Sequence, residues 1–175
     1  GASPSGPVHL GNLREFLTVH FVADELRRRG GQARHLHSWD DYDRFRKVPA
    51  GVDESWAEHI GRPLSAVPDP WDCHESWAEH FKAPLREALA EMGVEMEEIS
   101  QTQMYRSGAY RDQVLHAVRH RHALDAVLEK YRTKKKDSEE GDAPADAPED
   151  LSRFPYKPYC RGCGRDTVDL TSYDE

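Results

Sequence analysis

The residue types best suited to chemistry open the chain, in the stretch GASPSGPVHLGNLRE (1–15). His9 and Asn12 carry ring and amide donors that can bind a phosphate oxygen, and Ser5 adds a hydroxyl. Gly11 leaves room for a ligand to approach the backbone. Because the stretch runs into a predicted helix, whose first amides and dipole favour an anion, it predicts a phosphate site. A turn in which His9 and Asn12 only cap the helix is the alternative.

A second group of candidate residues is acidic and lies in DDYD (40–43). It directly follows a short stretch, 33–39, that is typical of a buried strand. Open α/β sheets bind ligands at the carboxyl ends of their strands. A carboxylate in this loop can therefore pair with a cationic group of a ligand. The alternative is a loop of solvated acids that caps the next element.

Two cysteines, Cys160 and Cys163 in YCRGCG, have the spacing of a zinc knuckle, whose tight turn lets backbone amides support both thiolates. They supply half of the ligands that a structural zinc needs. Cys73 and His74 lie in a different segment, so we expect the missing ligands to follow Glu175. Two reduced surface thiols are the alternative. The other histidines form no metal pattern that we can defend from the sequence: His20, His35, His37, His59, His80, His116, His120 and His122.

Hydrophobic spacing predicts the elements that must position these residues. Apolar residues recur at every third or fourth position from residue 9 or 10 to residue 29, where two glycines end the pattern, which predicts a helix. A loop, a helix, a strand and an acidic loop in this order are typical of an α/β fold. Further helices are predicted at 54–60, 75–92 and 110–132, and a second strand at 94–99.

Length and charge limit the classes of protein to consider. The chain has 175 residues, enough for one globular domain with a small appendage. Its formal net charge is −8, so overall charge does not make it a nucleic-acid binder, and we expect no DNA partner. No apolar run approaches the roughly 18 residues that span a bilayer, so we expect no membrane association and a cytoplasmic protein.

Composition changes sharply once, at TKKKDSEEGDAPADAPED (133–150), which is predicted to be a solvated linker or loop. Residues 1–132 form the predicted main domain, and residues 151–175 form a short region around the cysteine pair. The stretch 111–136 holds eight basic against three acidic side chains. It predicts either a surface that contacts RNA phosphates or the solvated face of a helix.

Taken together, three stretches resemble one known family, the class I lysyl-tRNA synthetases. They are GASPSGPVHLGNLRE (1–15), RHLHSWDDYDRFRKVP (34–49) and VPDPWDCHESWAEHF (67–81), and they occur in the order and at the separation typical of that family. HLGN at 9–12 looks like this family's form of the class I "HIGH" signature, with Asn12 in place of the second histidine.

This resemblance implies ATP-dependent activation of lysine to lysyl-adenylate and transfer of lysine to tRNA(Lys), with Mg²⁺ supporting the departure of pyrophosphate. The implied fold is part of a Rossmann-like catalytic domain followed by the start of a zinc-binding insertion. It implies a catalytic role for two of the residues that hold ATP, His9 and Asn12, and a lysine-contacting role for a second group. The implied ATP residues are Ser5, His9, Gly11 and Asn12, and the implied lysine residues are Gly1, Ser3 and Asp40.

We expect three features of the family pattern to be missing from this sequence. They are the strand that precedes the first loop, the lysine-rich second signature, which the lysines at 134–136 do not reproduce, and the helical anticodon-binding domain. We therefore expect an incomplete chain that is inactive by itself. Two other functions stay open. A related enzyme can load lysine onto an acceptor other than tRNA, and a truncated binding module can bind ligands without turnover.

Overall fold

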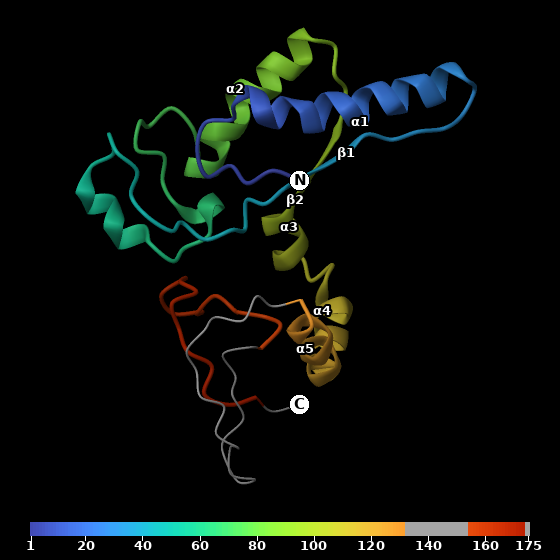
Figure 1. The fold of residues 1–175 in the computed structure, drawn as a ribbon. Coiled ribbons are helices and arrows are strands. Elements are labelled where there is room, and N and C mark those ends of the chain that lie inside the picture. Colours follow the sequence, from blue (N-terminus) through green and yellow to red (C-terminus); the bar gives the residue numbers. More distant parts are fainter. Residues whose placement is uncertain (132–153, 174–175) are drawn as a thin grey trace.

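The computed structural model describes residues 1–131 and 154–173 (Figure 1). The predicted linker at 133–150 lies outside the described residues. The two strands are β1 (Leu36–Trp39) and β2 (Glu97–Ser100). The helices are α1 (Leu10–Arg28), α2 (Trp77–Glu91), α3 (Gln101–Arg106), α4 (Arg111–Arg119) and α5 (Arg121–Glu129), with short 3-10 helices at Glu54–His59 and Leu64–Ala66. None of the helices in these described parts of the chain is long and apolar enough to cross a membrane.

The two strands run parallel, in register from Leu36 opposite Glu97 to Trp39 opposite Ser100. Parallel neighbours need a long crossover connection, and α2 lies within the segment that makes it here. Ala2 adds a further parallel bridge to Trp39. The predicted α/β character with parallel strands is therefore confirmed, although both strands are shorter than predicted.

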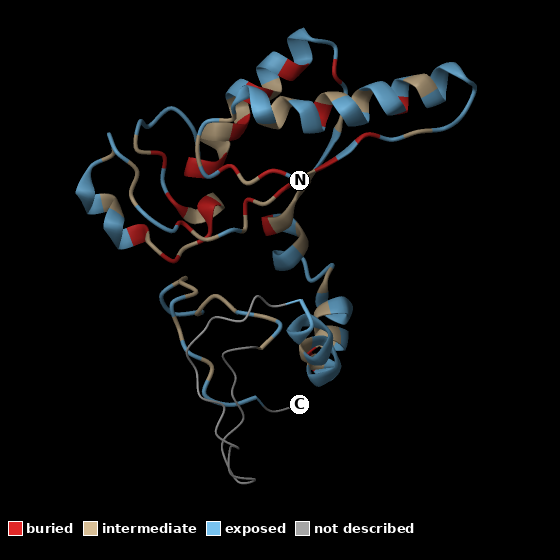
Figure 2. Cartoon of the chain, in the orientation of Figure 1, coloured by how far each residue is buried: buried red, intermediate tan, exposed pale blue. Residues whose placement is uncertain are grey.

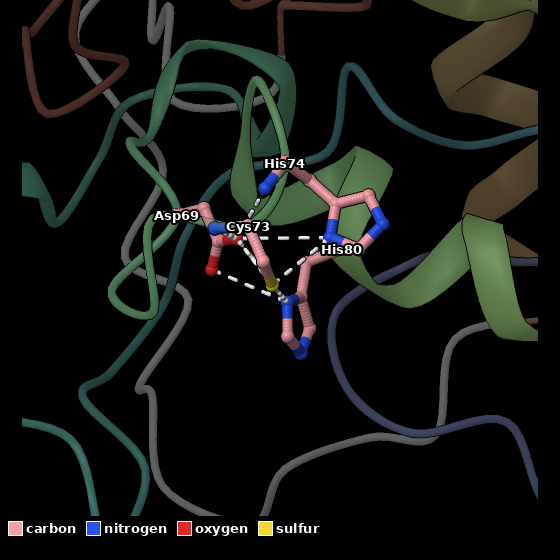
Figure 3. Close-up of side chains that lie close together, drawn as sticks. All are labelled: Asp69, Cys73, His74 and His80. Carbon is pink, nitrogen blue, oxygen red and sulfur yellow. Dashed lines mark hydrogen bonds and ion pairs between the residues drawn. The ribbon is translucent and has the colours of Figure 1, made fainter.

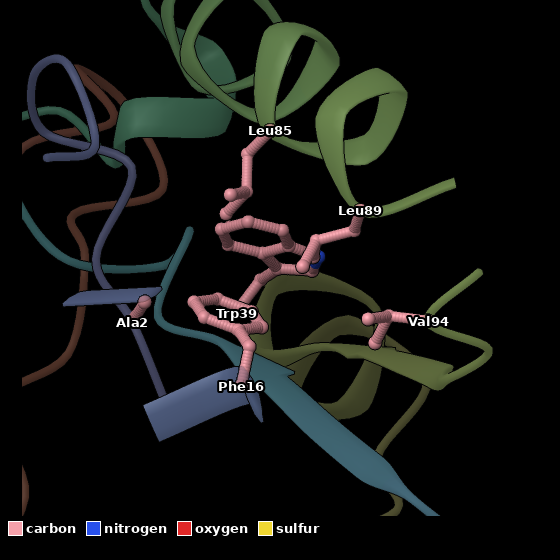
Figure 4. Packing of buried hydrophobic residues seen from close by; sticks show 6 residues of the cluster. All are labelled: Ala2, Phe16, Trp39, Leu85, Leu89 and Val94. Carbon is pink, nitrogen blue, oxygen red and sulfur yellow. The ribbon is translucent and has the colours of Figure 1, made fainter. Parts of the chain in front are cut away.

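The main core lies where α1 and α2 pack against β1 (Figure 4). Phe16 of α1 and Trp39 of β1 are each only 1% exposed, and their rings are 6.3 Å apart. Figure 2 shows buried residues around the strands, on α1 and α2 and in the segment between β1 and α2, whereas α4 and α5 are largely exposed. The complete cluster is Ala2, Phe16, Trp39, Leu85, Leu89 and Val94. This core fixes the start of α1 and the end of β1 relative to each other.

Two of the predicted helices differ from the observed ones. The stretch at 54–60 forms a 3-10 helix, and the single helix predicted at 110–132 is divided between α4 and α5 at His120. The His120 ring lies 2.8 Å from the His116 carbonyl, and the Arg121 guanidinium donates to the Val118 carbonyl at 3.3 Å. Because these side chains occupy carbonyls of the last turn, they favour a break in the helical ladder.

The segment 154–173 packs against the loop that follows β1. The Tyr159 hydroxyl donates to the Tyr42 carbonyl at 2.6 Å, and the Asp166 amide donates to the Gly61 carbonyl at 2.9 Å. Gly61 has a φ of +90°, and a Cβ there would lie 2.9 Å from the methyl group of Thr167. Only glycine fits this close approach, so the sequence specifies the contact.

Candidate active site and metal centre

His9 and Asn12 cap the start of α1. Nδ1 of His9 accepts a hydrogen bond from the Gly11 amide at 3.1 Å, and Oδ1 of Asn12 accepts one from the His9 amide at 3.3 Å. This reciprocal cap uses one ring nitrogen and one amide oxygen, so Nε2 of His9 and the amide nitrogen of Asn12 can face a ligand. His9 and Gly11 are exposed and Asn12 is partly exposed. Capping and anion binding at the helix start are therefore compatible in one geometry.

Of the residues predicted to contact lysine, Gly1 and Asp40 lie next to each other at the carboxyl end of β1. The Asp40 amide donates to the Ala2 carbonyl at 2.8 Å. A Cβ at Gly1 would lie 3.4 Å from both carboxylate oxygens of Asp40 and 3.0 Å from the Ser38 carbonyl, so glycine lets the two segments approach closely. Ser3 follows in the same segment and is half-buried.

A cavity of about 500 Å³ opens beside Asp40, between the loop after β1 and the segment 154–173. Its charged and aromatic lining consists of three carboxylates, three basic side chains and four tyrosines: Asp40, Asp43 and Asp166, Arg44, Arg46 and Lys157, and Tyr42, Tyr105, Tyr156 and Tyr159. The Tyr42 and Tyr105 rings stack with centroids 5.0 Å apart. Carboxylates and aromatic faces both attract an organic ammonium group, so this wall suits a cationic substrate.

The neighbouring carboxyls Asp40 and Asp41 have opposite electrostatic surroundings. Burial, together with the charge of Asp43, raises the pKa of Asp40. Burial also acts to raise the pKa of Asp41, but hydrogen bonds from Lys82, Ser100 and the Thr102 amide outweigh it and lower that pKa. Asp41 therefore stays ionised, and Lys82 balances its charge inside the protein. Asp40 faces the cavity, so it is the better partner for an incoming cation.

Cys160 and Cys163 lie in a tight turn, as their spacing predicts. The Cys160 amide donates to the Arg165 carbonyl, and the Gly164 amide donates to the Cys160 carbonyl, both at 2.8 Å. Hydrogen bonds from the Cys163 amide, the Gly162 amide and the Cys163 thiol lower the pKa of the Cys160 thiol. The turn therefore favours a thiolate, which is the form that binds a metal.

A second metal-ligating group lies in the loop before α2 and in the first turn of that helix (Figure 3). One ligand atom from each of its four residues lies within 4.8 Å of the others: Asp69, Cys73, His74 and His80. Sγ of Cys73 is 3.3 Å from Nδ1 of His80 and 3.2 Å from Nδ1 of His74. Ligand atoms around a tetrahedral zinc are about 3.3 to 3.8 Å apart, given metal–ligand distances of roughly 2.0 to 2.3 Å. The spacing of this group fits such a centre.

The loop backbone holds the Asp69 carboxylate in place. Its oxygens accept hydrogen bonds from the amides of Trp71, Cys73 and His74, at 3.1, 3.0 and 2.8 Å. Burial acts to raise the pKa of Asp69, but these bonds and the Cys73 thiol outweigh burial and lower it to about 2. The hydrogen bond to Asp69 in turn raises the pKa of the Cys73 thiol. A bound divalent cation would reverse that effect, because it favours the thiolate strongly.

This cluster corrects the expectation that the histidines form no metal pattern. His80 was grouped with the scattered histidines, but the structure places it close to Asp69, Cys73 and His74. The signal was present in the sequence as four ligand residues of three types within the stretch 69–80. The sequence analysis missed it because zinc patterns are usually recognised by paired cysteines or histidines, whereas this group places Asp-x3-Cys-His before a helix.

Comparisons with known proteins identify the family of the chain. The family described as tRNA synthetases class I (K) matches residues 1–175. The lysine–tRNA ligase of Streptomyces coelicolor is 55% identical over 197 residues, covering 100% of this chain and 34% of its own length. The lysine–tRNA ligase of Thermococcus kodakarensis is 41% identical over 174 residues, covering 99% of this chain and 31% of its own. That of Pyrococcus furiosus is 45% identical over 132 residues, covering 75% of this chain and 25% of its own.

The chain therefore spans about a third of the length of the first two of these relatives. The match to the family covers every residue, including the helix start with His9 and Asn12, the loop with Asp40 and the loop with Asp69. This chain accordingly belongs to the class I tRNA synthetases of the K family.

Proposed function

We propose that the protein containing this chain is a lysine–tRNA ligase, which activates lysine with ATP and transfers it to tRNA(Lys). The observation that carries the proposal is the family match over the whole chain, combined with two complementary sites on one scaffold. One is the positive end of α1 with its His9 and Asn12 donors. The other is the tyrosine-rich cavity beside Asp40, which offers the Asp40 carboxylate to an ammonium group. A triphosphate suits the first, and a cationic amino acid suits the second.

In the proposed activation step, the lysine carboxylate attacks the α-phosphate of ATP, and pyrophosphate leaves. Mg²⁺ bound with ATP would supply charge neutralisation for the phosphates. His9 and Asn12 donate hydrogen bonds to the phosphate oxygens, where negative charge develops, and Gly11 and Ser5 line the nucleotide's approach. Asp40 pairs with an ammonium group of lysine, while Gly1 and Ser3 shape the path beside it. The chain's own residues thus mainly orient the reactants and stabilise charge.

In the proposed transfer step, a ribose hydroxyl at the end of tRNA attacks the lysyl-adenylate and releases AMP. Basic residues in and directly after α4 and α5 give this part of the molecule a means of binding RNA phosphates, through Arg111 and Arg119 of α4 and Lys130 at the end of α5. Because the reaction joins an amino acid to tRNA, the proposal also places the protein in the cytoplasm. The proposed domain plan keeps a Rossmann-like part at 1–132 and an insertion beginning at 151–175.

We further propose that zinc binds at Asp69, Cys73, His74 and His80. One thiolate and two imidazoles, completed by a carboxylate, favour zinc over magnesium or calcium. A structural role suits the cluster, because three backbone amides already orient Asp69. Cys160 and Cys163 remain candidates for half of a second zinc site.

Amino-acid-dependent exchange of pyrophosphate into ATP tests the proposed activity in the full-length protein. Lysine should support faster exchange than arginine or ornithine. Asp40→Asn should weaken lysine use, whereas Asp53→Asn, at an exposed carboxyl that caps the 3-10 helix Glu54–His59, should not. Faster exchange with another amino acid would contradict the assignment of lysine.

The acceptor needs a separate assay. Purified lysyl-adenylate complex is mixed with tRNA(Lys) or with small amines, and transfer of labelled lysine is measured. Transfer to tRNA supports the ligase, whereas transfer only to amines supports the related enzyme with a different acceptor. Binding of lysine and ATP without exchange supports a non-catalytic binding module.

A further inference from the structure

Asp41 and Lys82 form an ion pair in the interior of the protein. Nζ of Lys82 is 2.7 Å from Oδ2 of Asp41, and the two side chains are only 3% and 2% exposed. Lysine is rarely buried to this extent without a partner. Removing both charges from water costs about as much as their attraction returns, so such a pair is a poor source of stability by itself. The arrangement needs another explanation.

The contacts of Asp41 indicate what the pair does. Besides Lys82 of α2, Oδ2 of Asp41 accepts the hydroxyl of Ser100, the last residue of β2, at 2.7 Å. Oδ1 accepts the amide of Thr102, in the first turn of α3, at 2.8 Å. The Asp41 carbonyl accepts the Ser65 amide at 3.1 Å. One residue therefore joins four separate elements at the carboxyl ends of both strands.

Asp40 is covalently joined to this fixed point. Its Cα lies about 3.8 Å from that of Asp41, so the bonds of Asp41 hold the backbone of Asp40 from one side. From the other side, the Asp40 amide donates to the Ala2 carbonyl at 2.8 Å. The Asp40 carboxylate then lies against Gly1 and at the wall of the cavity.

We propose that Asp41 and Lys82 are positioning residues for the amino-acid subsite. They hold the loop after β1 so that Asp40, and not Asp41, presents its carboxylate to the substrate's ammonium group. Lys82 neutralises Asp41 internally, which prevents the neighbouring acid from competing for the same cation. This inference rests on the proposed function, because that proposal assigns Asp40 to the substrate.

The test uses the full-length protein and the variant Asp41→Asn. The amide cannot accept from both the Thr102 amide and Lys82 as the carboxylate does, because one of its two polar atoms is a donor. We expect lysine affinity, measured by calorimetry, to fall about tenfold, with the KM for lysine in exchange rising by the same factor and the KM for ATP unchanged. Glu97→Gln is the matched control, since it breaks the Arg34 ion pair at the opposite end of the strands.

A second variant separates positioning from folding. Asp41→Leu with Lys82→Met removes both charges at similar volume, a replacement that buried ion pairs often tolerate. Leucine at position 41 leaves the Thr102 amide without its acceptor, so we expect this variant to melt below the wild-type temperature but still to fold. We expect the folded variant to bind lysine about tenfold more weakly than wild type. Wild-type lysine affinity in either folded variant would overturn the proposal, and so would equal losses for lysine and ATP.

The outcomes also distinguish this inference from the proposed function. A wild-type protein that binds no amino acid would remove both. A wild-type protein that binds and activates lysine, with unchanged affinity in the folded double variant, would remove only the positioning role. If a different amino acid supports exchange, the proposed function fails, and the same affinity comparison with that amino acid still decides whether Asp41 and Lys82 position Asp40.

Discussion

Two junctions between a loop and a helix carry the candidate functional residues of this molecule, and they are built differently. At the start of α1, the residues predicted to do chemistry, His9 and Asn12, are also the residues that cap the helix. At the start of α2, Ser76 caps the helix alone, by accepting the Glu79 amide at 3.2 Å. The candidate metal ligands at 69–80 surround that cap without taking part in it.

This difference shows how a helix start can be used in two ways. Small residues before α1 leave space beside its first turn, which suits a ligand that comes and goes. Side chains before α2 converge on a single point, which suits an ion that stays bound. The junctions also touch, because the indole of Trp77 donates to the Ser5 carbonyl at 3.3 Å. The loop that carries the candidate metal ligands can therefore support the candidate phosphate-binding loop before α1.

The largest expected effect is the loss of metal from the second junction. In the full-length protein, Cys73→Ser with His80→Ala removes two of the four ligands. We expect metal affinity to fall at least about 1000-fold, since even the loss of an outer partner commonly costs 10- to 100-fold. Cobalt substitution measures this, because cobalt bound by a thiolate and imidazoles absorbs visible light in a way that reports its ligands.

Cys163→Ser is the matched control for that experiment. It removes a thiol from the other candidate region and should leave the cobalt spectrum of the 69–80 cluster unchanged. An identical spectrum in wild type and in the Cys73→Ser, His80→Ala variant would show that the cluster does not bind the ion. Loss of the spectrum only in Cys163→Ser would move the metal centre to the cysteine turn.

A smaller but still large effect is expected at the first junction. If His9 and Asn12 stabilise charge at the α-phosphate, Asn12→Ala should slow adenylate formation on the order of 100- to 1000-fold, or roughly 3 to 4 kcal/mol. If they only cap α1, the cost should be about 1 kcal/mol of stability, with a normal rate in the folded protein. Single-turnover kinetics measured beside a urea melt separate the two roles.

Ala23→Gly provides the stability control for Asn12→Ala. Ala23 is buried inside α1, 4% exposed, and glycine there should cost about 1 kcal/mol without touching the helix start. Equal rates in Asn12→Ala and Ala23→Gly would show that Asn12 builds the junction and does not take part in the chemistry.

The sequence predicted the first junction better than the second, for a physical reason. The HLGN stretch and the helix behind it are local, so spacing alone places His9 and Asn12 together at the start of α1. The turn at Cys160 and Cys163 is equally local. The group at 69–80 requires a loop to fold back onto the first turn of α2, held by amide bonds to Asp69 and a positive φ of 53° at Asp72. Periodicity contains no information about such a loop.

The repeated hexapeptide ESWAEH illustrates the same limit. Its first copy forms the 3-10 helix Glu54–His59, whereas its second copy, at 75–80, contains the cap and first turn of α2. Trp56 is partly exposed, but Trp77 is fully buried against Phe45. Identical residues therefore adopt different structures because tertiary packing decides between them. The Asp41–Lys82 pair could not be predicted from the sequence either, since 41 positions separate its partners.

Two ionisable groups that support the junctions, His37 beneath α1 and Asp69 before α2, should affect the stability of the protein over different ranges of pH. His37 lies under α1 with its ring 4.3 Å from Phe16, and burial lowers its pKa to about 4. Because the unfolded chain binds this proton first, stability should fall as the pH drops from about 6.5 to about 4, by about 2 kcal/mol, and then level off. Asp69, with a pKa of about 2, stays ionised over this range.

Urea melts between pH 7 and pH 4 measure this slope, and the difference between wild type and His37→Leu isolates it. The charged groups that face the ring in the structure include Glu98 on β2, which acts to raise its pKa, and His35 on the same strand segment, which acts to lower it. These groups remain in the variant, so their own titration largely cancels. A slope that persists in His37→Leu would assign the pH response elsewhere.

The smallest expected effect comes from Ser76, and it tests the comparison most directly. Ser76→Ala removes the cap of α2 and should cost about 1 kcal/mol of stability, whereas Ser76→Thr should retain most of it. Because Ser76 is none of the four ligands, metal affinity should stay unchanged in both variants, and so should the rate of adenylate formation. If Ser76→Ala weakened metal binding as well, helix capping and metal binding would be coupled at α2. The second junction would then resemble the first, where His9 and Asn12 are expected both to cap α1 and to take part in the chemistry. Metal affinity measured beside the melt in both variants therefore decides whether the second junction separates its structural and chemical residues.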